Sequence, residues 1–363
     1  MNPSQSPRLP TLDDLSLADL EGVRLLLRGG SVIDWYRLNF EDADAIRSFL
    51  EVQGLVLDDP GDLARAEVVK KSAMSYLRRH FDFPIPKPVA NEDLPGLIAL
   101  ASSKGHRQLC ACTILKVMHI IHHLEARELL FRTAIREADL ADRVHRRIMT
   151  EADRMHERGL PIVEFRGNMK RRSSLVTKLL AKKESVAAQI FDRVRYRIVT
   201  ERTEQIPSVV LYLAEHLFPF SYAVPGQTQN NLVRFGDVLR AHPHGAEIGA
   251  KLQLPADLER RDPSEFRNEF SGKGFRVLNF VVDLPVRVDD LLPPLDPMVD
   301  ELGRDVFSLV EFQVVDQATA LKNEEGDASH ERYKKRQLQR VLRRLSRGLV
   351  VPKRKAKPAK GAS

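Results

Sequence analysis

The sequence is poor in cysteine and lacks a long hydrophobic run, and each absence excludes a class of protein. Only two cysteines occur in 363 residues, Cys110 and Cys112, too few for a disulfide framework or a four-ligand zinc site. We expect both to be small buried side chains of a cytoplasmic protein. No window holds the roughly 18 apolar residues that span a bilayer, so no membrane contact is expected. The N-terminus has no basic segment followed by an apolar one, which argues against a signal peptide.

Excess positive charge is also missing from most of the chain. The net charge is +7, yet residues 331–363 hold thirteen Lys and Arg against one acidic residue, which leaves −5 for residues 1–330. Contact with a polyanion should therefore map to the C-terminus, and we expect RNA there; the alternative is a solubilising tail. A basic amphipathic helix is predicted over 331–349. Its apolar face should dock on the domain through Leu338, Val341, Leu342 and Leu345.

The pattern of apolar residues divides the chain into three parts. Residues 1–160 are predicted to be mostly helical, with Pro-rich punctuation at 83–88 and helices near 17–27, 109–131 and 148–158. Beyond Pro161, strands are predicted near 162–165, 190–199, 275–284 and 307–315, with helices at 171–183 and 206–217 and an insertion at 235–267. The expected fold class is α+β: a helical N-terminal region (1–160), a mixed sheet flanked by helices (161–335), and a basic helix with a disordered tail (336–363).

Three histidines in the helix near 109–131 suggest a metal site at first sight. His119 and His123 are four residues apart and share a helix face. No Asp or Glu lies between them to complete a zinc-protease pattern, and this region lacks the His-Asp dipeptide of metal-dependent phosphohydrolases. We therefore favour a structural role for His119, His122 and His123.

A basic segment follows the first predicted strand. Between 165 and 183 there are seven Lys and Arg, among them Arg166, Lys170 and Lys178. A strand-to-helix junction offers backbone N–H groups and the positive end of a helix dipole, which suit a polyphosphate. A solvated helix face would have the same composition, so this segment alone leaves both readings open.

Two carboxylates interrupt otherwise apolar or basic strands. Asp192 lies in the strand predicted near 190–199, and Glu311 lies in the middle of 309–315. A carboxylate inside a strand is costly unless it is paired or bound to a metal. Two of them on neighbouring strands could share Mg²⁺, which prefers one or two carboxylates together with substrate phosphates. Solvated side chains at strand edges are the alternative.

Six segments between 160 and 335 resemble, in the same order, the synthetase domain of RelA/SpoT-type alarmone enzymes. Gly167, Lys170 and Ser174 match its G-R-x-K-x-x-Y-S segment, and Lys178 matches the lysine that follows. The metal-binding strand F-D-x-x-x-x-R-I resembles 191–198, with Asp192 and Arg197 in place. The remaining matches are Pro225-Gly226, the G-Y-x-S-x-H loop at 274–279, the E-x-Q strand at 311–313, and the A-x-H-x-x-Y-K ending at 328–334, which contains His330.

This resemblance implies a nucleotidyltransferase that transfers pyrophosphate from ATP to a nucleotide or to an RNA 3′-hydroxyl. It implies that Asp192 and Glu311 hold Mg²⁺ and that Glu311 also acts as the general base. Phe275 would stack on the acceptor base. The other nucleotide-binding positions implied are Arg166, Lys170, Ser174, Lys178, Arg197, Gln313 and His330. Positioning and charge neutralisation would supply most of the catalysis.

The chain also departs from the family pattern. Asn168 replaces the motif Arg, Asn279 replaces the loop His, and Val315 replaces the Arg that follows E-x-Q. Retention of Asp192 and Glu311 favours an enzyme. The replacements favour a catalytically degenerate protein that binds a nucleotide or RNA and regulates. A structural or interaction protein is the third hypothesis.

Overall fold

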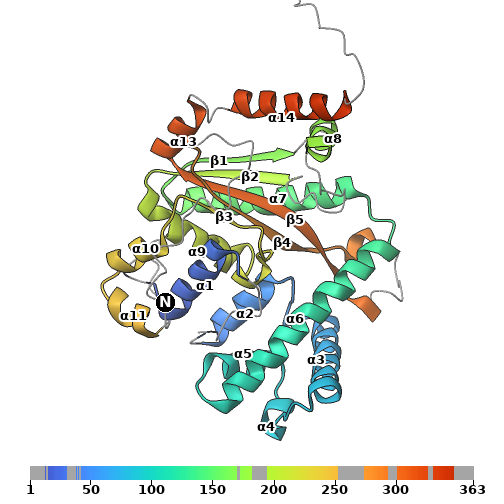
Figure 1. Ribbon diagram of the computed structural model, residues 1–363. Coiled ribbons are helices and arrows are strands. Elements are labelled where there is room, and N and C mark those ends of the chain that lie inside the picture. Colours follow the sequence, from blue (N-terminus) through green and yellow to red (C-terminus); the bar gives the residue numbers. More distant parts are fainter. Residues whose placement is uncertain are drawn as a thin grey trace, which may run out of the picture.

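The computed structural model describes residues 13, 15–30, 38, 40, 42–169, 172–181, 194–251, 274–292, 301–325 and 330–346. Lys170, Asp192 and the tail from 347 onwards lie outside the described residues, and the side chains of Lys178 and His330 are not described. Helices and one five-stranded mixed sheet make up the fold, which confirms the predicted α+β class (Figure 1).

The N-terminal half is helical, as predicted. Local sequence sets the helix ends: Ser16 and Asp19 form a capping box at the start of α1, and Gly29 ends it at a φ of 65°. The helices are α1 (Leu17–Arg28), α2 (Ala43–Val52), α3 (Pro60–Phe81), α4 (Lys87–Ala90), α5 (Leu94–Ser102), α6 (His106–Arg132) and α7 (Glu137–Glu157).

These helices contribute to two hydrophobic cores. One core lies among α2, α3, α5 and α6 and contains Cys110 and Cys112, which are buried as predicted. Figure 1 shows α3 to α6 grouped at one end of the molecule. The other core joins α1 and α7 to the sheet through Leu20, Val144 and Ile148. The helical region is therefore not packed as one separate unit.

The 27-residue helix α6 differs from the expectation that no segment is long and apolar enough to span a membrane. By length and composition alone it could cross a membrane, and a third of its most apolar window (33%) is buried inside the protein. The core helix of a soluble protein passes the same test, so this is weak evidence for a membrane span. Here α6 packs against α3, α5 and β5.

The sheet has the strand order β1-β2-β5-β4-β3. Among the described strands the β2–β5 pair is parallel, and the other three pairs are antiparallel. The strands are β1 (Ile162–Met169), β2 (Val194–Thr200), β3 (Gln229–Asn230), β4 (Leu278–Arg287) and β5 (Asp305–Asp316).

Alternation along the strands gives the sheet two different faces. One face is apolar and carries Tyr196, Phe280 and Phe312, whose rings pack against one another in the main core. Helices α7 and α9 (Ile206–His216) cover this face. The opposite face carries polar side chains in the middle of β2 and β5, and the candidate site lies there.

The remaining described α-helices fall between the strands along the chain or after β5. The segment at 235–267, expected to be an irregular insertion, begins with α10 (Phe235–Ala241) and α11 (Gly245–Lys251), and 252–273 lie outside the described residues. The others are α8 (Arg172–Ala181), α13 (Gln317–Glu324) and α14 (His330–Leu345).

The predicted docking of α14 is wrong in most of its residues. The helix packs against α8, and Val341 is buried against Ala181. Leu338, Leu342 and Leu345 are 56%, 53% and 55% exposed. Of the four predicted docking residues, only Val341 is buried in the described structure.

Candidate functional site

The polar face of the sheet is built from two cross-strand rows. Register partners share a face because side chains alternate along each strand. The first row runs Asn168, Arg195, Glu311, Val281 across β1, β2, β5 and β4. The second runs Arg166, Arg197, Gln313, Asn279, Gln229 across all five strands. Four predicted site residues, Arg166, Arg197, Glu311 and Gln313, are therefore brought together.

Glu311 lies in the middle of β5 and is 5% exposed. The Nε of Arg195 donates a hydrogen bond of 2.7 Å to its Oε2 from the adjacent strand. The side chains of Arg195 and Glu311 are 27% and 7% exposed. A buried carboxylate needs such a partner, because taking it out of water without one is costly. Sequence reasoning identified Glu311 but missed Arg195, which only the strand register brings beside it.

Each of the two predicted arginines also has a carboxylate nearby. The Nε of Arg166 lies 3.3 Å from Glu164 Oε1 on the same strand. The Nη1 of Arg197 lies 3.3 Å from Glu324 Oε1 at the end of α13. Exposure decreases from the edge inwards: the Arg166 side chain is 75% exposed and that of Arg197 is 32% exposed.

The other predicted phosphate ligands belong to the segment that follows β1. Ser174 is exposed in the first turns of α8, and Lys178 lies one turn further along the same helix. Gly167 pairs with Tyr196, and a Cβ there would lie 2.8 Å from the Tyr196 ring. Glycine at this motif position therefore has a packing reason in this chain.

Phe275 is partly buried where the loop at 274–279 enters β4. It packs on a small cluster that contains Val199, Val315 and Ala320. Two asparagines hold the loop: Asn231 Nδ2 donates to the Phe275 carbonyl over 2.8 Å, and Asn323 bonds both backbone groups of Arg276. The ring therefore lies at one end of the polar rows, on a segment fixed by side-chain amides.

Asn279, at the position of the family's loop histidine, is the register partner of Gln313. Its Oδ1 is buried and has no hydrogen-bond partner in the part of the chain that the structure describes. A buried acceptor without a partner is uncommon in folded proteins. No signal in the sequence marks this atom, because its surroundings come from three different strands.

The three histidines of α6 lie at the other end of the polar face. His123 stacks on Phe307 with ring centroids 3.9 Å apart, and its Nε2 lies 3.8 Å from Asp283 Oδ2. Burial lowers the pKa of His122 to about 3 and that of His123 to about 4. Burial raises the pKa of Asp283, on the same sheet face as Glu311, to about 6. The histidines are therefore neutral packing groups at neutral pH.

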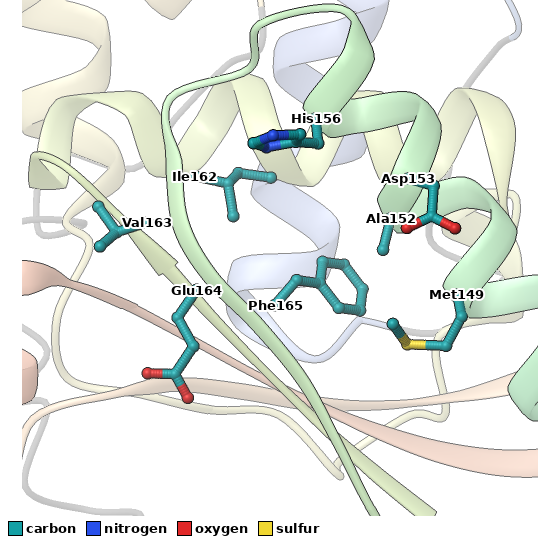
Figure 2. A pocket seen from close by; sticks show the side chains of 8 residues that line it. All are labelled: Met149, Ala152, Asp153, His156, Ile162, Val163, Glu164 and Phe165. Atoms are coloured by element: carbon teal, nitrogen blue, oxygen red, sulfur yellow. The ribbon is translucent and has the colours of Figure 1, made fainter.

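A hollow of about 300 Å³ lies between α7 and the edge strand β1. Figure 2 shows it between Met149, Ala152, Asp153 and His156 of α7 and 162–165 of β1. Glu311 lies two strands away in the sheet order. This hollow therefore belongs to the edge of the main core and not to the polar face.

The donor set on the polar face fits a magnesium ion that brings its own oxygen ligands. Among the described residues, no group of three or more His, Cys, Asp or Glu could hold a metal. Glu311 supplies one carboxylate in the rows, and Mg²⁺ is commonly bound by one or two carboxylates plus substrate phosphates. A nucleotide complex of Mg²⁺ suits this arrangement better than an ion held by protein alone.

Comparison with known proteins gives no match to a family model and none to a curated sequence. Among solved structures, the chain is similar to small alarmone synthetase 1 from Bacillus subtilis bound to its product pppGpp, at 16% identity over 51% of this chain and 72% of that chain, with a TM-score of 0.28. Small alarmone synthetase 2 from Bacillus subtilis gives 14% identity over 56% and 93%, with a TM-score of 0.28. A GTP pyrophosphokinase family protein from Streptococcus pneumoniae gives 13% over 59% and 90%, with a TM-score of 0.29. At these values the likeness assigns no activity to this chain, whose function rests on its own residues.

Proposed function

We propose that the polar face of the sheet binds ATP and an acceptor and transfers pyrophosphate to a 3′-hydroxyl of a nucleotide or an RNA. The observation that carries this proposal is the buried Glu311 carboxylate, held by Arg195 in the middle of a strand, with Arg166 and Arg197 in the neighbouring cross-strand row. A buried charged group costs stability, and such groups concentrate at functional sites. The sequence resemblance to RelA/SpoT-type synthetases supports the same reaction.

In the proposed reaction the 3′-oxygen of the acceptor attacks the β-phosphorus of ATP. The bond from this phosphorus to the oxygen that bridges it to the α-phosphate breaks, AMP leaves, and the hydroxyl proton passes to Glu311. The triphosphate lies against Arg166, Lys170, Ser174 and Lys178, with Arg197, Gln313 and His330 as further contacts. Phe275 stacks on the acceptor base. Asp192 and Glu311 hold Mg²⁺, which neutralises phosphate charge when bound.

Incubation with ATP labelled in the β-phosphate, Mg²⁺ and a panel of nucleotides and RNAs tests this proposal. Labelled pyrophosphate should move to an acceptor, as seen by chromatography, and E311Q should abolish the transfer. E325Q removes an exposed carboxylate at the end of α13 and serves as the matched control. Transfer that survives in E311Q, or no transfer to any acceptor by the wild type, would contradict the proposal.

A regulator that binds nucleotide without turnover is the second candidate function. The replacements Asn168 and Asn279 favour it, and so does the guanidinium of Arg195 beside the only carboxylate in the described rows. Calorimetry for ATP binding, combined with chromatography for AMP, separates the two candidates, because the regulator binds ATP and releases no AMP. In both cases K170A should weaken ATP binding by about 1–3 kcal/mol, the scale of a charge-assisted hydrogen bond. A wild type that binds no nucleotide would leave an interaction protein as the remaining hypothesis.

RNA contact by the basic C-terminus is a separate part of the proposal. Thirteen Lys and Arg between 331 and 363 would neutralise several phosphates and release counterions. The RNA affinity should fall with salt by a log–log slope of roughly −0.7 per contact on single strands. Deleting residues 350–363 should make that slope less steep by several units, because several phosphate contacts would be lost. Equal affinity and equal slope in both proteins would mean that the tail only solubilises.

A further inference from the structure

Three arginines crowd the polar face at positions where like charges repel. Arg166 and Arg197 are direct register partners on the antiparallel strands β1 and β2. Side chains at such positions have Cβ atoms roughly 5 Å apart, and like charges directly opposite destabilise a sheet. Arg195 is two residues from Arg197 on the same face, beside Glu311. Three arginines at neighbouring positions of one sheet face are stabilised when anions lie near them.

The described structure supplies one carboxylate to each arginine, but the three pairs are not equivalent. The pair Arg195–Glu311 is the most enclosed, with side chains 27% and 7% exposed. In the pair Arg197–Glu324 the carboxylate is 66% exposed, and in the pair Arg166–Glu164 the arginine is 75% exposed. Both outer contacts are 3.3 Å long. Exposed ion pairs of this kind contribute little to stability, so a stronger anion can replace their carboxylates.

We propose that Glu164 and Glu324 are resident counter-anions, which the oligophosphate of a bound nucleotide displaces to bridge Arg166 and Arg197. One phosphate chain then neutralises two arginines at once, whereas each carboxylate neutralises one. Arginine suits this exchange because its planar fork binds phosphate oxygens in pairs. Arg195 stays with Glu311 and extends the row of positive charge towards it. This inference rests on the proposed function only in taking the polar face as the nucleotide site.

The exchange of carboxylates for phosphates predicts that the site selects ligands by the number of linked phosphates. A single phosphate that reaches one arginine replaces one carboxylate, and the net gain is small. Two or more linked phosphates replace both carboxylates and remove the repulsion between Arg166 and Arg197. The site should therefore favour pyrophosphate and nucleoside triphosphates over phosphate and nucleoside monophosphates.

Calorimetric titration with inorganic pyrophosphate tests the inference without any need for turnover. E164Q and E324Q each remove a competing anion and should tighten pyrophosphate binding by about three- to tenfold, which combines the strength of an exposed pair with relief of repulsion. E325Q is the control, because it changes the net charge by the same amount at a residue next to Glu324 that is in none of the three described arginine–carboxylate pairs. It should change the affinity for pyrophosphate by less than about twofold. R166A and R197A should each weaken binding, and the double variant should lose little more than either one, because one ligand bridges both.

Several results would overturn the inference. It falls if E324Q and E164Q bind pyrophosphate no more tightly than E325Q, or if no variant binds it. Additive losses in R166A and R197A would remove the bridge. R166K, with its charge kept and its fork removed, gives a check that does not depend on folding, since Arg166 is exposed. Tighter binding in E324Q without any transfer of label would leave this inference standing and remove the proposed reaction alone.

Discussion

Replacing Arg195 with alanine should destabilise the fold by about 3 kcal/mol, because it removes the guanidinium that faces the buried Glu311 carboxylate. Removing one partner of a buried ion pair costs about 3–5 kcal/mol. The Glu311 side chain is 7% exposed, so its charge depends on protein partners. Arg195 is 27% exposed, so water can partly replace its guanidinium, which sets the cost at the lower end of that range.

Urea unfolding followed by circular dichroism measures this loss. The midpoint should fall in R195A with an unchanged slope, since the surface exposed on unfolding hardly changes. Adding E311Q to R195A should restore much of the lost free energy, because the amide carries no charge to compensate. A loss below about 1 kcal/mol, or the same loss with Glu and with Gln at 311, would refute the reasoning.

Two further predictions concern groups at the junction between the helices and the sheet. Burial raises the pKa of Asp283 from 3.8 to about 6, against the opposing effect of Arg127; the folded state therefore favours the protonated form, and this contribution is lost as the pH rises from about 4 through 6. Asp283→Asn should raise the melting temperature more at about pH 8 than at about pH 4 by differential scanning fluorimetry, and an equal shift at both would contradict it. Arg147 donates from Nη2 to the carbonyls of Val52 (2.7 Å) and Leu217 (3.1 Å). Arg147→Met should cost about 3 kcal/mol in urea unfolding, because it leaves these acceptors without donors, and a loss indistinguishable from zero would contradict it.

The elements with a strong local period were predictable from the sequence. The charged helix predicted through Ile148 to about 158 is α7, which ends at Glu157. The strand near 307–315 is β5, and its single internal carboxylate, Glu311, pointed to a functional group. Periodicity and an unusual charge are properties of one segment, so no knowledge of the fold was needed to detect them.

Features that depend on the strand order were not predictable in this way. Arg195 and Glu311 are 116 residues apart in the sequence, and Arg197 and Glu324 are 127 residues apart. Nothing in either segment indicates which strand will be its neighbour. The leucines of α14 are another example. Periodicity predicts which residues share a helix face, but it does not predict how much of that face another element covers. The metal pair stays a prediction, because Asp192 lies outside the described residues.

Partly apolar groups border the polar rows at both ends of the strands. At one end α6 covers β4 and β5, where His123 stacks on Phe307 next to Asp283. At the other end Phe275 packs with the cluster beside α13. The rows that contain Arg195 and Glu311 lie between these two partly apolar ends. Electrostatic attraction is stronger where water is partly excluded, so an oligophosphate bound between the ends would be held more tightly than on an open surface with the same arginines. The N-terminal helices therefore bear on the site through α6, even though none of the residues proposed to contact the nucleotide belongs to them.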